Sequence, residues 1–387
     1  MTTGSAGRQN NWRKIAGKQR RKQIEQEENN RETVMKTIVE KIYQGQQKDE
    51  RDEIIKRAGE IIKNGGLVAF PTETVYGLGA DALNEEAAKK IYAAKGRPSD
   101  NPLIVHIADM GAIAGITETI PKKAGIVADA FWPGPLTMIF RKNARVPDGT
   151  TGGLDTVAVR MPDHAAAREL IHAGGGYVAA PSANTSGRPS PTDACHVEAD
   201  MAGKIDMIID SGSVDIGVES TILDMTVEPP MILRPGAVTR EMLEALIGRV
   251  AVDGTLISDT STEAPKAPGM KYRHYAPKAK LTVVAGEISA VVEEIRRLCR
   301  ERMKEGRKVG IIATEETVMK YTQGNVKCIG TREDESTIAS HLYGILREFD
   351  SDEVDCIYSE AFEADGIGSA VMNRLMKAAG QHVIEVK

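Results

Sequence analysis

The sequence predicts an α/β protein with two domains, a mixed sheet flanked by helices and a smaller C-terminal Rossmann-like domain with a parallel sheet. Three observations support this prediction. Helix-like and strand-like hydrophobic patterns alternate from residue 49 onward, a stretch with little periodicity spans residues 247–280, and a regular strand and helix rhythm resumes over residues 281–387. A chain of 387 residues with 41% hydrophobic residues is long enough to bury two cores.

The first domain is expected at residues 35–246. It opens with a strand-like stretch at Met35 (MKTIV), and after Asp49 isoleucine and alanine recur at helical spacing until Gly65 and Gly66 end the helix. Further strands are expected at 67–70, 103–107, 136–140 and 157–160, and further helices at 85–94 and 124–131. This alternation is typical of a layered α/β structure with a mixed sheet.

A linker is expected at residues 247–280, because Ser, Thr, Pro and Gly accumulate there. The linker also carries an aromatic and polar cluster, MKYRHYAP, at residues 270–277. The second domain follows at 281–387, with strands at 281–285, 309–313, 326–329, 355–358 and 382–386 and helices at 288–304 and 337–349. Strands that alternate with helices in this way favour a parallel, Rossmann-like sheet.

Residues 1–34 form a basic segment that differs from the rest of the chain. The segment holds eight Lys or Arg and four Glu, so it carries +4 while the other residues carry −9 of the total charge of −5. Few large apolar side chains are present, which predicts a disordered or loosely helical extension. It is interpreted either as a dispensable tail or as an RNA-binding arm, and Met35 is an alternative start.

Composition excludes several classes of protein. The four cysteines stand far apart without a CxxC pair or a Cys/His cluster, so neither a disulfide framework nor a structural metal site is predicted. No run of about 18 apolar residues is present for a membrane span, and the first residues lack the apolar stretch of a secretory signal. A cytoplasmic protein without membrane contact is therefore expected.

Two bases, Lys95 and Arg97, end the expected helix at 85–94. The chain has neither a GxxxxGK[ST] loop nor a GxGxxG fingerprint, so a phosphate group would need other donors. An ammonium and a guanidinium supply such donors, although a basic helix end is also favourable on its own. The polar turn that follows, with Asn101, keeps both bases near the edge of a strand.

His106 and Arg160 each stand in an otherwise apolar strand. His106 is interpreted as a ligand contact or as a satisfied core residue. Arg160 ends its strand, at the edge where ligands of α/β sheets bind, or pairs with Asp163 on the surface.

The loop after Ala180 combines small side chains with hydroxyl and amide groups, and its Ser182, Asn184 and Ser190 offer donors to an anion. Ser220 begins another expected strand, and Arg234 precedes a rigid Pro-Gly turn. No GxSxG elbow or Ser/His/Asp order is present. Binding and positioning of two substrates is therefore favoured over covalent catalysis.

The motifs PTETVYGLGADA, KGRPSDNPLIVH, FWPGPLT, VAVRMP, APSANTSGRPSPT, ESTI and LRPGA, in this order, resemble the Sua5/YrdC/YciO family. HYAP and GIGSAVMNRLMKAA make the resemblance Sua5-like, and it covers about residues 35–387. The KxR and SxN signature of the family corresponds to Lys95, Arg97, Ser182 and Asn184. The resemblance implies a YrdC-like twisted mixed sheet joined to a Sua5-type C-terminal domain.

The resemblance also implies an activity: a nucleotidyltransferase that makes threonylcarbamoyl-AMP and pyrophosphate from L-threonine, bicarbonate and ATP. The product would serve the t6A modification of adenosine 37 in tRNA through separate transferase proteins, so tRNA is an indirect partner. ATP is then a substrate whose phosphates carry Mg²⁺. Two other classes stay open, an RNA-binding module and a relative of the carbamoyl transferases.

By resemblance, the site residues fall into three groups. The threonine contacts are Thr74, His106, Arg160, Ala180 and Ser220. The ATP contacts are Arg97, Asn101, Thr156, Ser182, Asn184, Ser190, Arg234 and Tyr275. Lys95 and Arg97 are the catalytic pair, Tyr275 of the linker is expected to close over the cleft as a lid, and no side chain is expected to bind a metal.

Overall fold

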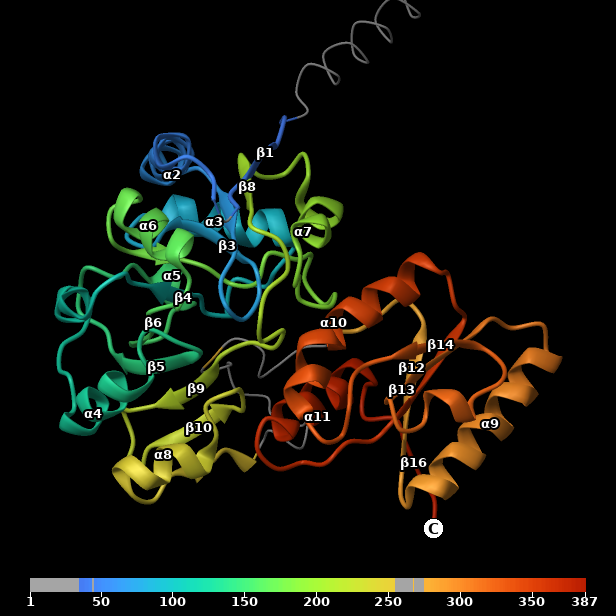
Figure 1. The fold of residues 1–387 in the computed structure, drawn as a ribbon. Helices are drawn as coiled ribbons and strands as arrows, with labels where there is room; N and C mark the ends of the chain where they lie inside the picture. Colours follow the sequence, from blue (N-terminus) through green and yellow to red (C-terminus); the bar gives the residue numbers. More distant parts are fainter. Residues whose placement is uncertain (1–34, 44, 255–266, 268–274) are drawn as a thin grey trace, which may run out of the picture.

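The structure is a computed structural model that describes residues 35–43, 45–254, 267 and 275–387. Two domains lie side by side (Figure 1), and the predicted fold class is confirmed. Within these residues the first domain has an eleven-stranded mixed sheet in the order β1-β8-β2-β3-β7-β4-β6-β5-β9-β10-β11. The second has a five-stranded parallel sheet in the order β14-β13-β15-β12-β16.

Most expected elements of the first domain are present. Its strands are β1 (Ile38–Lys41), β2 (Val68–Phe70), β3 (Gly77–Asp81), β4 (Ile104–His106), β5 (Leu136–Arg141), β6 (Thr156–Arg160), β7 (Val178–Ala179), β8 (Met207–Asp210), β9 (Thr221–Asp224), β10 (Met231–Arg234) and β11 (Ala251–Val252). Its helices are α2 (Lys48–Lys63), α3 (Glu85–Lys95), η1 (Met110–Gly115), α4 (Lys122–Phe131), α5 (Asp148–Thr151), α6 (Ala165–Ala173), α7 (Ala194–Met201) and α8 (Arg240–Ile247). Strand β11 pairs with β10, so the sheet reaches into the stretch expected to be linker.

Strand alternation decides which face of this sheet holds the polar side chains. Val105 and Val159 belong to the core that packs on α3, α4, α7 and α8. Their neighbours His106 and Arg160 therefore lie on the opposite face. Helices α2 and α6 cover that face only over β2, β7 and β8. The remaining part, over β4, β6, β5 and β9, is free of these helices and holds polar groups.

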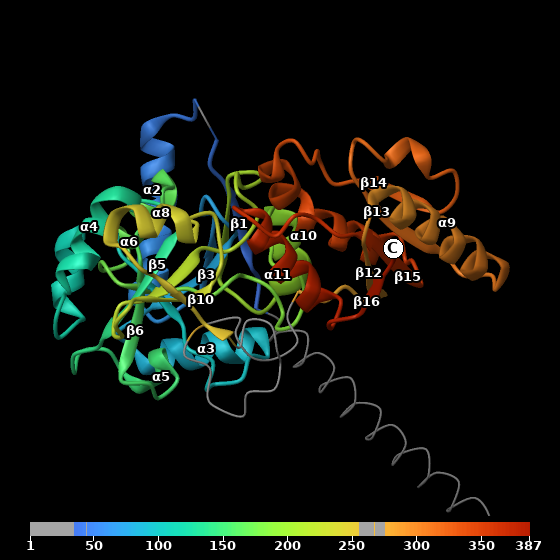
Figure 2. The same ribbon diagram turned by 90° about the horizontal axis from the view of Figure 1, so that it is seen from below.

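The second domain is built from β12 (Lys280–Ala285), β13 (Val309–Ala313), β14 (Asn325–Cys328), β15 (Cys356–Glu360), β16 (Val383–Glu385), α9 (Ile288–Lys304), η3 (Val318–Lys320), α10 (Glu335–Ser351) and α11 (Gly368–Ala378). Helix α9 packs on one face of its sheet, and α10 and α11 pack on the other. Both views show α10 and α11 on the side of the first domain and α9 on the far side (Figures 1 and 2).

The two domains share a hydrophobic core. Val75 and Val218 of the first domain and Tyr275 of the linker pack in one cluster with Leu342 and Tyr343 of α10. Gly217 lies so close to α10 that a Cβ there would be 2.5 Å from the Ala339 carbonyl oxygen. This close approach brings α10 against the loop that leads to β9. No helix in the described ranges is long and apolar enough to cross a membrane.

Candidate active site

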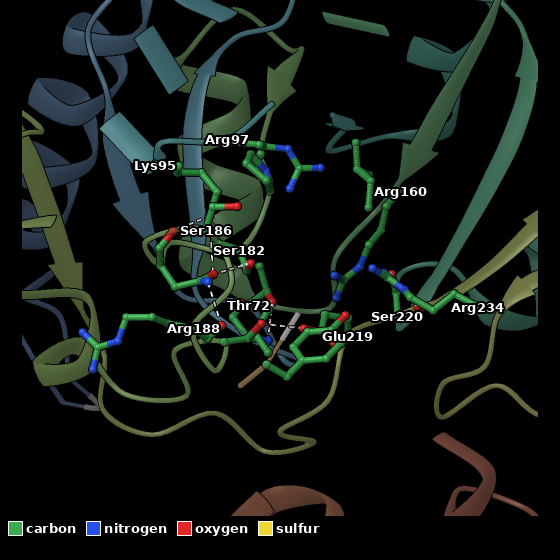
Figure 3. A pocket seen from close by; sticks show the side chains of 18 of the residues that line it. Thr72, Lys95, Arg97, Arg160, Ser182, Ser186, Arg188, Glu219, Ser220 and Arg234 are labelled. Atoms are coloured by element: carbon green, nitrogen blue, oxygen red, sulfur yellow. Dashed lines mark hydrogen bonds between the residues drawn. The ribbon is translucent and has the colours of Figure 1, made fainter. Parts of the chain in front are cut away.

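A pocket on the open face of the first sheet gathers most of the predicted site residues. Figure 3 shows Lys95 and Ser182 on one side, Arg160, Ser220 and Arg234 on the other, and Glu219 between them. Of the predicted residues, the pocket is lined by Lys95, Arg97, His106, Arg160, Ala180, Ser182, Asn184, Ser190, Ser220, Arg234 and Tyr275. With Arg188, which also lines the pocket, five cationic side chains thus surround one small space.

Helix α3 delivers Lys95 and Arg97 to the pocket. The Asn84 side chain caps the start of the helix, and Gly96 ends it with a left-handed φ of 61°. Arg97 is then held by Asn101: its Nε donates to the Asn101 carbonyl (3.2 Å) and its Nη2 to Asn101 Oδ1 (2.5 Å). Burial and the Arg234 charge contribute to lowering the pKa of Arg97 to about 10, at which the guanidinium stays charged at pH 7.

Lys95 lines the pocket and is also bonded to the loop that follows β7. The side chain is 1% exposed, and Nζ donates to the carbonyls of Ser182 and Asn184, the latter at 2.6 Å. Burial, followed by the Arg97 charge, lowers the pKa of the Lys95 ammonium well below its usual value. Lys95 therefore fixes the backbone of the loop after β7, and its catalytic role stays a prediction.

That loop is internally bonded. Ser182 Oγ donates to Asn184 Oδ1 (2.6 Å), and Asn184 Nδ2 donates to the carbonyls of Thr185 (2.8 Å) and Arg188 (3.0 Å). Gly77 of β3 bridges to Ser182 from the opposite side. The small side chains of the loop leave its backbone next to the pocket, which is what an anion needs in order to approach closely.

Arg160 lines the opposite wall and is held from behind by Thr74 and Glu73. Its Nη1 donates to Thr74 Oγ1 (2.9 Å), and its Nη2 lies 2.7 Å from Glu73 Oε1 in a buried ion pair. The expected alternative pairing with Asp163 is not among the ion pairs of the described residues. A guanidinium with a fork of donors at this place suits a carboxylate.

His106 lies beside Arg160 and packs edge-on against Phe70, with ring centroids 6.1 Å apart. Burial and the Arg160 charge lower the pKa of His106 to about 3. The imidazole is therefore neutral at pH 7, so it adds a polar contact without further positive charge. His106 is buried, as a core residue would be, and it also lines the pocket, so a contact with a ligand stays a prediction.

Ser220 and Arg234 are bonded to each other. Arg234 Nε donates to the Ser220 carbonyl (3.0 Å) and its Nη2 to Ser220 Oγ (3.1 Å), while Thr137 Oγ1 lies 2.8 Å from Ser220 Oγ. Burial lowers the pKa of Arg234. Both residues stand at the ends of adjacent strands, β9 and β10, which explains why they meet.

Three predicted residues do not line the pocket. Thr74 and Asn101 stand behind it, bonded to Arg160 and Arg97. Thr156 begins β6, about 13 Å along the strand from Arg160, since each residue adds about 3.3 Å.

Other lining residues were not predicted from the sequence, among them Thr72, Ser186, Arg188 and Glu219. Glu219 was within the quoted ESTI motif, but a glutamate ahead of a strand gave no sign that it is buried.

Tyr275 of the linker is the residue through which the second domain reaches the pocket. Its ring stacks on Tyr343 of α10 with centroids 5.2 Å apart, and Ala276 N donates to the Gly187 carbonyl (2.9 Å). Tyr275 has a φ of 65°, which is rare for a bulky residue. Residues 268–274, including the rest of the MKYRHY sequence, and residues 1–34, with the predicted extension, lie outside the described residues.

Comparison with known proteins gives consistent matches. Residues 60–236 match the Sua5/YciO/YrdC family model, described as telomere recombination, and residues 238–380 match the model described as threonylcarbamoyl-AMP synthase, C-terminal domain. Threonylcarbamoyl-AMP synthase of Bacillus subtilis is 50% identical over 86% of this chain and 95% of its own length. The Pyrococcus abyssi protein of the same name is 49% identical over 86% of this chain and 96% of its own.

A solved structure agrees. The crystal structure of P. abyssi Sua5 complexed with L-threonine superposes with a TM-score of 0.85 at 46% identity, covering 91% of this chain and all of that one. A doubly substituted variant of the same P. abyssi protein gives a TM-score of 0.85 at 45% identity over 90% of this chain and 98% of its own. The likeness therefore extends over both domains.

Proposed function

Because the chain belongs to the Sua5/YrdC/YciO family, we propose that it is an enzyme that makes threonylcarbamoyl-AMP and pyrophosphate from L-threonine, bicarbonate and ATP. The observation that carries the proposal is the distribution of charge in the pocket. Arg160 lies on one wall with the polar, neutral His106 and with Arg234, and Arg97 comes from the end of α3, next to the Lys95 that bonds the small-residue loop. We infer that the part of the pocket at Arg160 and His106 takes the amino acid and that the part at Arg97 and Arg234 takes the polyphosphate.

The threonine subsite is assigned to Arg160, His106, Thr74, Ser220 and the backbone at Ala180. Arg160 has a planar fork of donors for the carboxylate, and its buried partner Glu73 holds the guanidinium in place. Ser220 Oγ and Thr74 Oγ1 are hydroxyls within hydrogen-bond distance of Arg234 and Arg160. These short polar groups would orient the amine and the side-chain hydroxyl of threonine.

The nucleotide subsite is assigned to Arg97, Asn101, Ser182, Asn184, Ser190, Arg234 and Tyr275, with Thr156 retained as a prediction. The threonine amine reacts with bicarbonate to give an N-carboxylate and water. An oxygen of that carboxylate attacks the α-phosphate, and the bond to pyrophosphate breaks. Negative charge builds up along this path, so Arg97 and Arg234 would stabilise the transition state electrostatically, while Lys95 keeps the loop in place.

The described residues that line the pocket offer few ligands for Mg²⁺. Glu219 is the one carboxylate among the described lining residues and is already paired with Arg374, and Glu73, behind the lining, is paired with Arg160. We therefore assign the ion to the phosphates of ATP, where it would help to neutralise the leaving group. Water exclusion matters because an N-carboxylate decomposes readily, and Tyr275 is placed to serve as part of a lid.

We further propose that the product is consumed in the cytoplasm by separate transferase proteins that modify adenosine 37 of tRNA to t6A. The class of the enzyme is then nucleotidyltransferase. The test is release of pyrophosphate from ATP, measured with threonine and bicarbonate omitted one at a time. Release that needs both supports the proposal, whereas release that is indifferent to threonine contradicts it. Activity with carbamoyl phosphate in place of bicarbonate and ATP would favour a carbamoyl transferase.

A further inference from the structure

Glu219 is a buried carboxylate that stands where the two domains meet. It is 6% exposed and lines the pocket. Its oxygens accept hydrogen bonds from Ser190 Oγ (2.5 Å), from Tyr343 OH (2.9 Å) and from Arg374 Nε (3.0 Å). Ser190 belongs to the first domain, Tyr343 to α10 and Arg374 to α11. The carboxylate is thus bonded from both domains.

Arg374 is unusual among the side chains of the described chain. It is the largest of the fully buried side chains. Besides the ion pair with the Glu219 carboxylate, its Nη2 lies 3.4 Å from the Glu219 carbonyl, and its Cζ lies 5.8 Å from the centre of the Tyr275 ring. A guanidinium of the second domain therefore meets one lining carboxylate and one lining aromatic ring.

Both ends of Glu219 connect to residues assigned to substrate. Its carboxylate holds the Ser190 hydroxyl, and its backbone leads directly into Ser220, which is bonded to Arg234. The loop with Ser190 is supported a second time, because Arg347 Nη2 of α10 donates to the Pro189 carbonyl (2.5 Å). A shift of Glu219 would therefore move a nucleotide contact and a threonine contact together.

Charge gives the pair a second consequence. The pocket is proposed to take ATP, and an unpaired carboxylate in its lining would repel the phosphates. Burial raises the pKa of Glu219, but the charges of Arg374 and Arg234 and the bonds from Ser190 and Arg374 lower it to about 2. Glu219 is thus ionised at pH 7, and Arg374 supplies its closest counter-ion from the other domain.

We propose that Arg374 and Tyr343 are positioning residues of the active site: they fix and neutralise Glu219, and the second domain thereby completes the nucleotide subsite of the first. The inference rests on the proposed function and deepens it, since it gives the second domain a role in substrate binding. Docking of the two domains alone would need only contact between their surfaces. Here Tyr343 OH and Arg374 Nε both donate to Glu219, a carboxylate that lines the pocket, so the second domain also acts on the pocket lining.

The first experiment is Tyr343→Phe, which removes one hydroxyl and keeps the ring that packs against Tyr275. Its matched control is Tyr321→Phe in the same domain, because Tyr321 OH likewise donates to a buried carboxylate, Glu360 Oε1 (2.8 Å), away from the pocket. We expect Tyr343→Phe to raise the KM for ATP about 10-fold and the control to leave it unchanged. Equal KM values in the two variants would overturn the proposal.

The second experiment separates neutralisation from packing. Arg374→Met removes the ion-pair partner of Glu219 and leaves its charge facing only the more distant Arg234, and we expect the KM for ATP to rise about 10- to 100-fold. The double variant Arg374→Met with Glu219→Gln removes the charge as well, so ATP affinity should recover in part. No recovery would show that Arg374 acts only in packing and would contradict neutralisation. If Arg374→Met does not fold, Arg374→Lys, which keeps the charge, is compared with Arg374→Gln, which removes it, and an equal KM for ATP in these two variants would contradict neutralisation.

Calorimetric measurement of ATP binding keeps this test independent of the reaction. The parent is assayed first for threonine- and bicarbonate-dependent pyrophosphate release, and a parent without it contradicts the proposed function. The Kd for ATP of the Tyr343→Phe and Tyr321→Phe variants is then still informative. A weaker Kd in Tyr343→Phe alone supports the positioning role, and identical Kd values refute it.

Discussion

The two domains place their buried charges differently. In the first domain, buried Lys95, Arg97, Arg160 and Arg234 surround a pocket on one face of a sheet. In the second, the described buried charges are Arg347, Asp350, Glu360 and Arg374, and of these only Glu360 is paired inside its own domain, with Arg332. Arg347 and Arg374 form ion pairs with Asp200 and Glu219 of the first domain, and Asp350 with Arg188.

The contrast shows that two α/β domains with similar layers can direct their buried charges differently, one toward a pocket and the other toward its neighbour. The first sheet leaves part of one face free of helices for the pocket, and the second sheet is covered on both faces by α9 and by α10 with α11. The second domain therefore contributes polar groups only where α10 and α11 face its neighbour. Substitutions in either domain can test this contrast.

The largest expected effect would break the contact between the domains. Arg347→Met removes a guanidinium that lies 3.0 Å from Asp200 Oδ2, with both side chains at most 5% exposed. Loss of one partner of a buried pair should lower the free energy of unfolding by about 3 kcal/mol. Chemical denaturation measures it, and Lys327→Met, on the surface pairs with Glu348 and Asp352, is the control with a loss below about 1 kcal/mol. An equal loss of unfolding free energy in the two variants would mean that the buried pair between the domains stabilises the chain no more than a surface pair does.

The next effect concerns the pocket of the first domain. Arg97→Ala should lower kcat/KM for pyrophosphate release by about 100-fold, because a buried guanidinium aimed at developing charge is lost. Arg297→Ala on the exposed face of α9, where Arg297 pairs with Glu294 and Glu301, is the matched control and should keep full activity. Full activity of Arg97→Ala would exclude this pocket as the catalytic site.

A smaller effect should distinguish the two subsites. Arg160→Lys keeps a positive charge near Glu73 but loses the planar fork that suits a carboxylate. We expect the KM for threonine to rise about 10-fold while the KM for ATP stays within about twofold. Initial rates at varied threonine and fixed ATP measure the first value, and the reverse experiment measures the second. A rise in the KM for ATP alone would instead assign Arg160 to the nucleotide subsite.

The smallest effect tests the neutral histidine. The pKa of His106 is about 3 in the folded chain and 6.5 in the unfolded one, so its contribution to stability is present above pH 6.5. It is lost as pH falls, because only the unfolded state then takes up the proton. Between about pH 7.5 and 5.5 this amounts to about 1.4 kcal/mol. In urea denaturation, the free energy of unfolding of His106→Gln should therefore fall less between these pH values than that of the parent. An equal fall in the two proteins would contradict a neutral His106.

Much of this architecture follows from the sequence. Hydrophobic periods predicted both sheets, and motifs at strand ends predicted Arg160, Ser220 and Arg234, because strand ends meet at one edge of a sheet. The bonding of Lys95 was not predictable, since a helix-terminal lysine gives no sign that its donors turn to loop carbonyls.

Glu219 and Arg374 were missed for another reason. They lie 155 residues apart in different domains, and each stands in a local pattern that is typical of a solvent-exposed side chain. Periodicity and spacing describe local structure, so only the docking of α11 on the first domain reveals the pair.

The ion pair of Glu219 with Arg374 also sets an order in time. The first domain leaves the ribosome before the second, and at about 5–20 residues per second the 155 residues between the two partners need roughly 8–30 s of synthesis. During that interval the Glu219 carboxylate lacks its counter-ion. If Arg374 completes the nucleotide subsite as proposed, a nascent chain gains that subsite only when α11 has emerged and docked on the first domain.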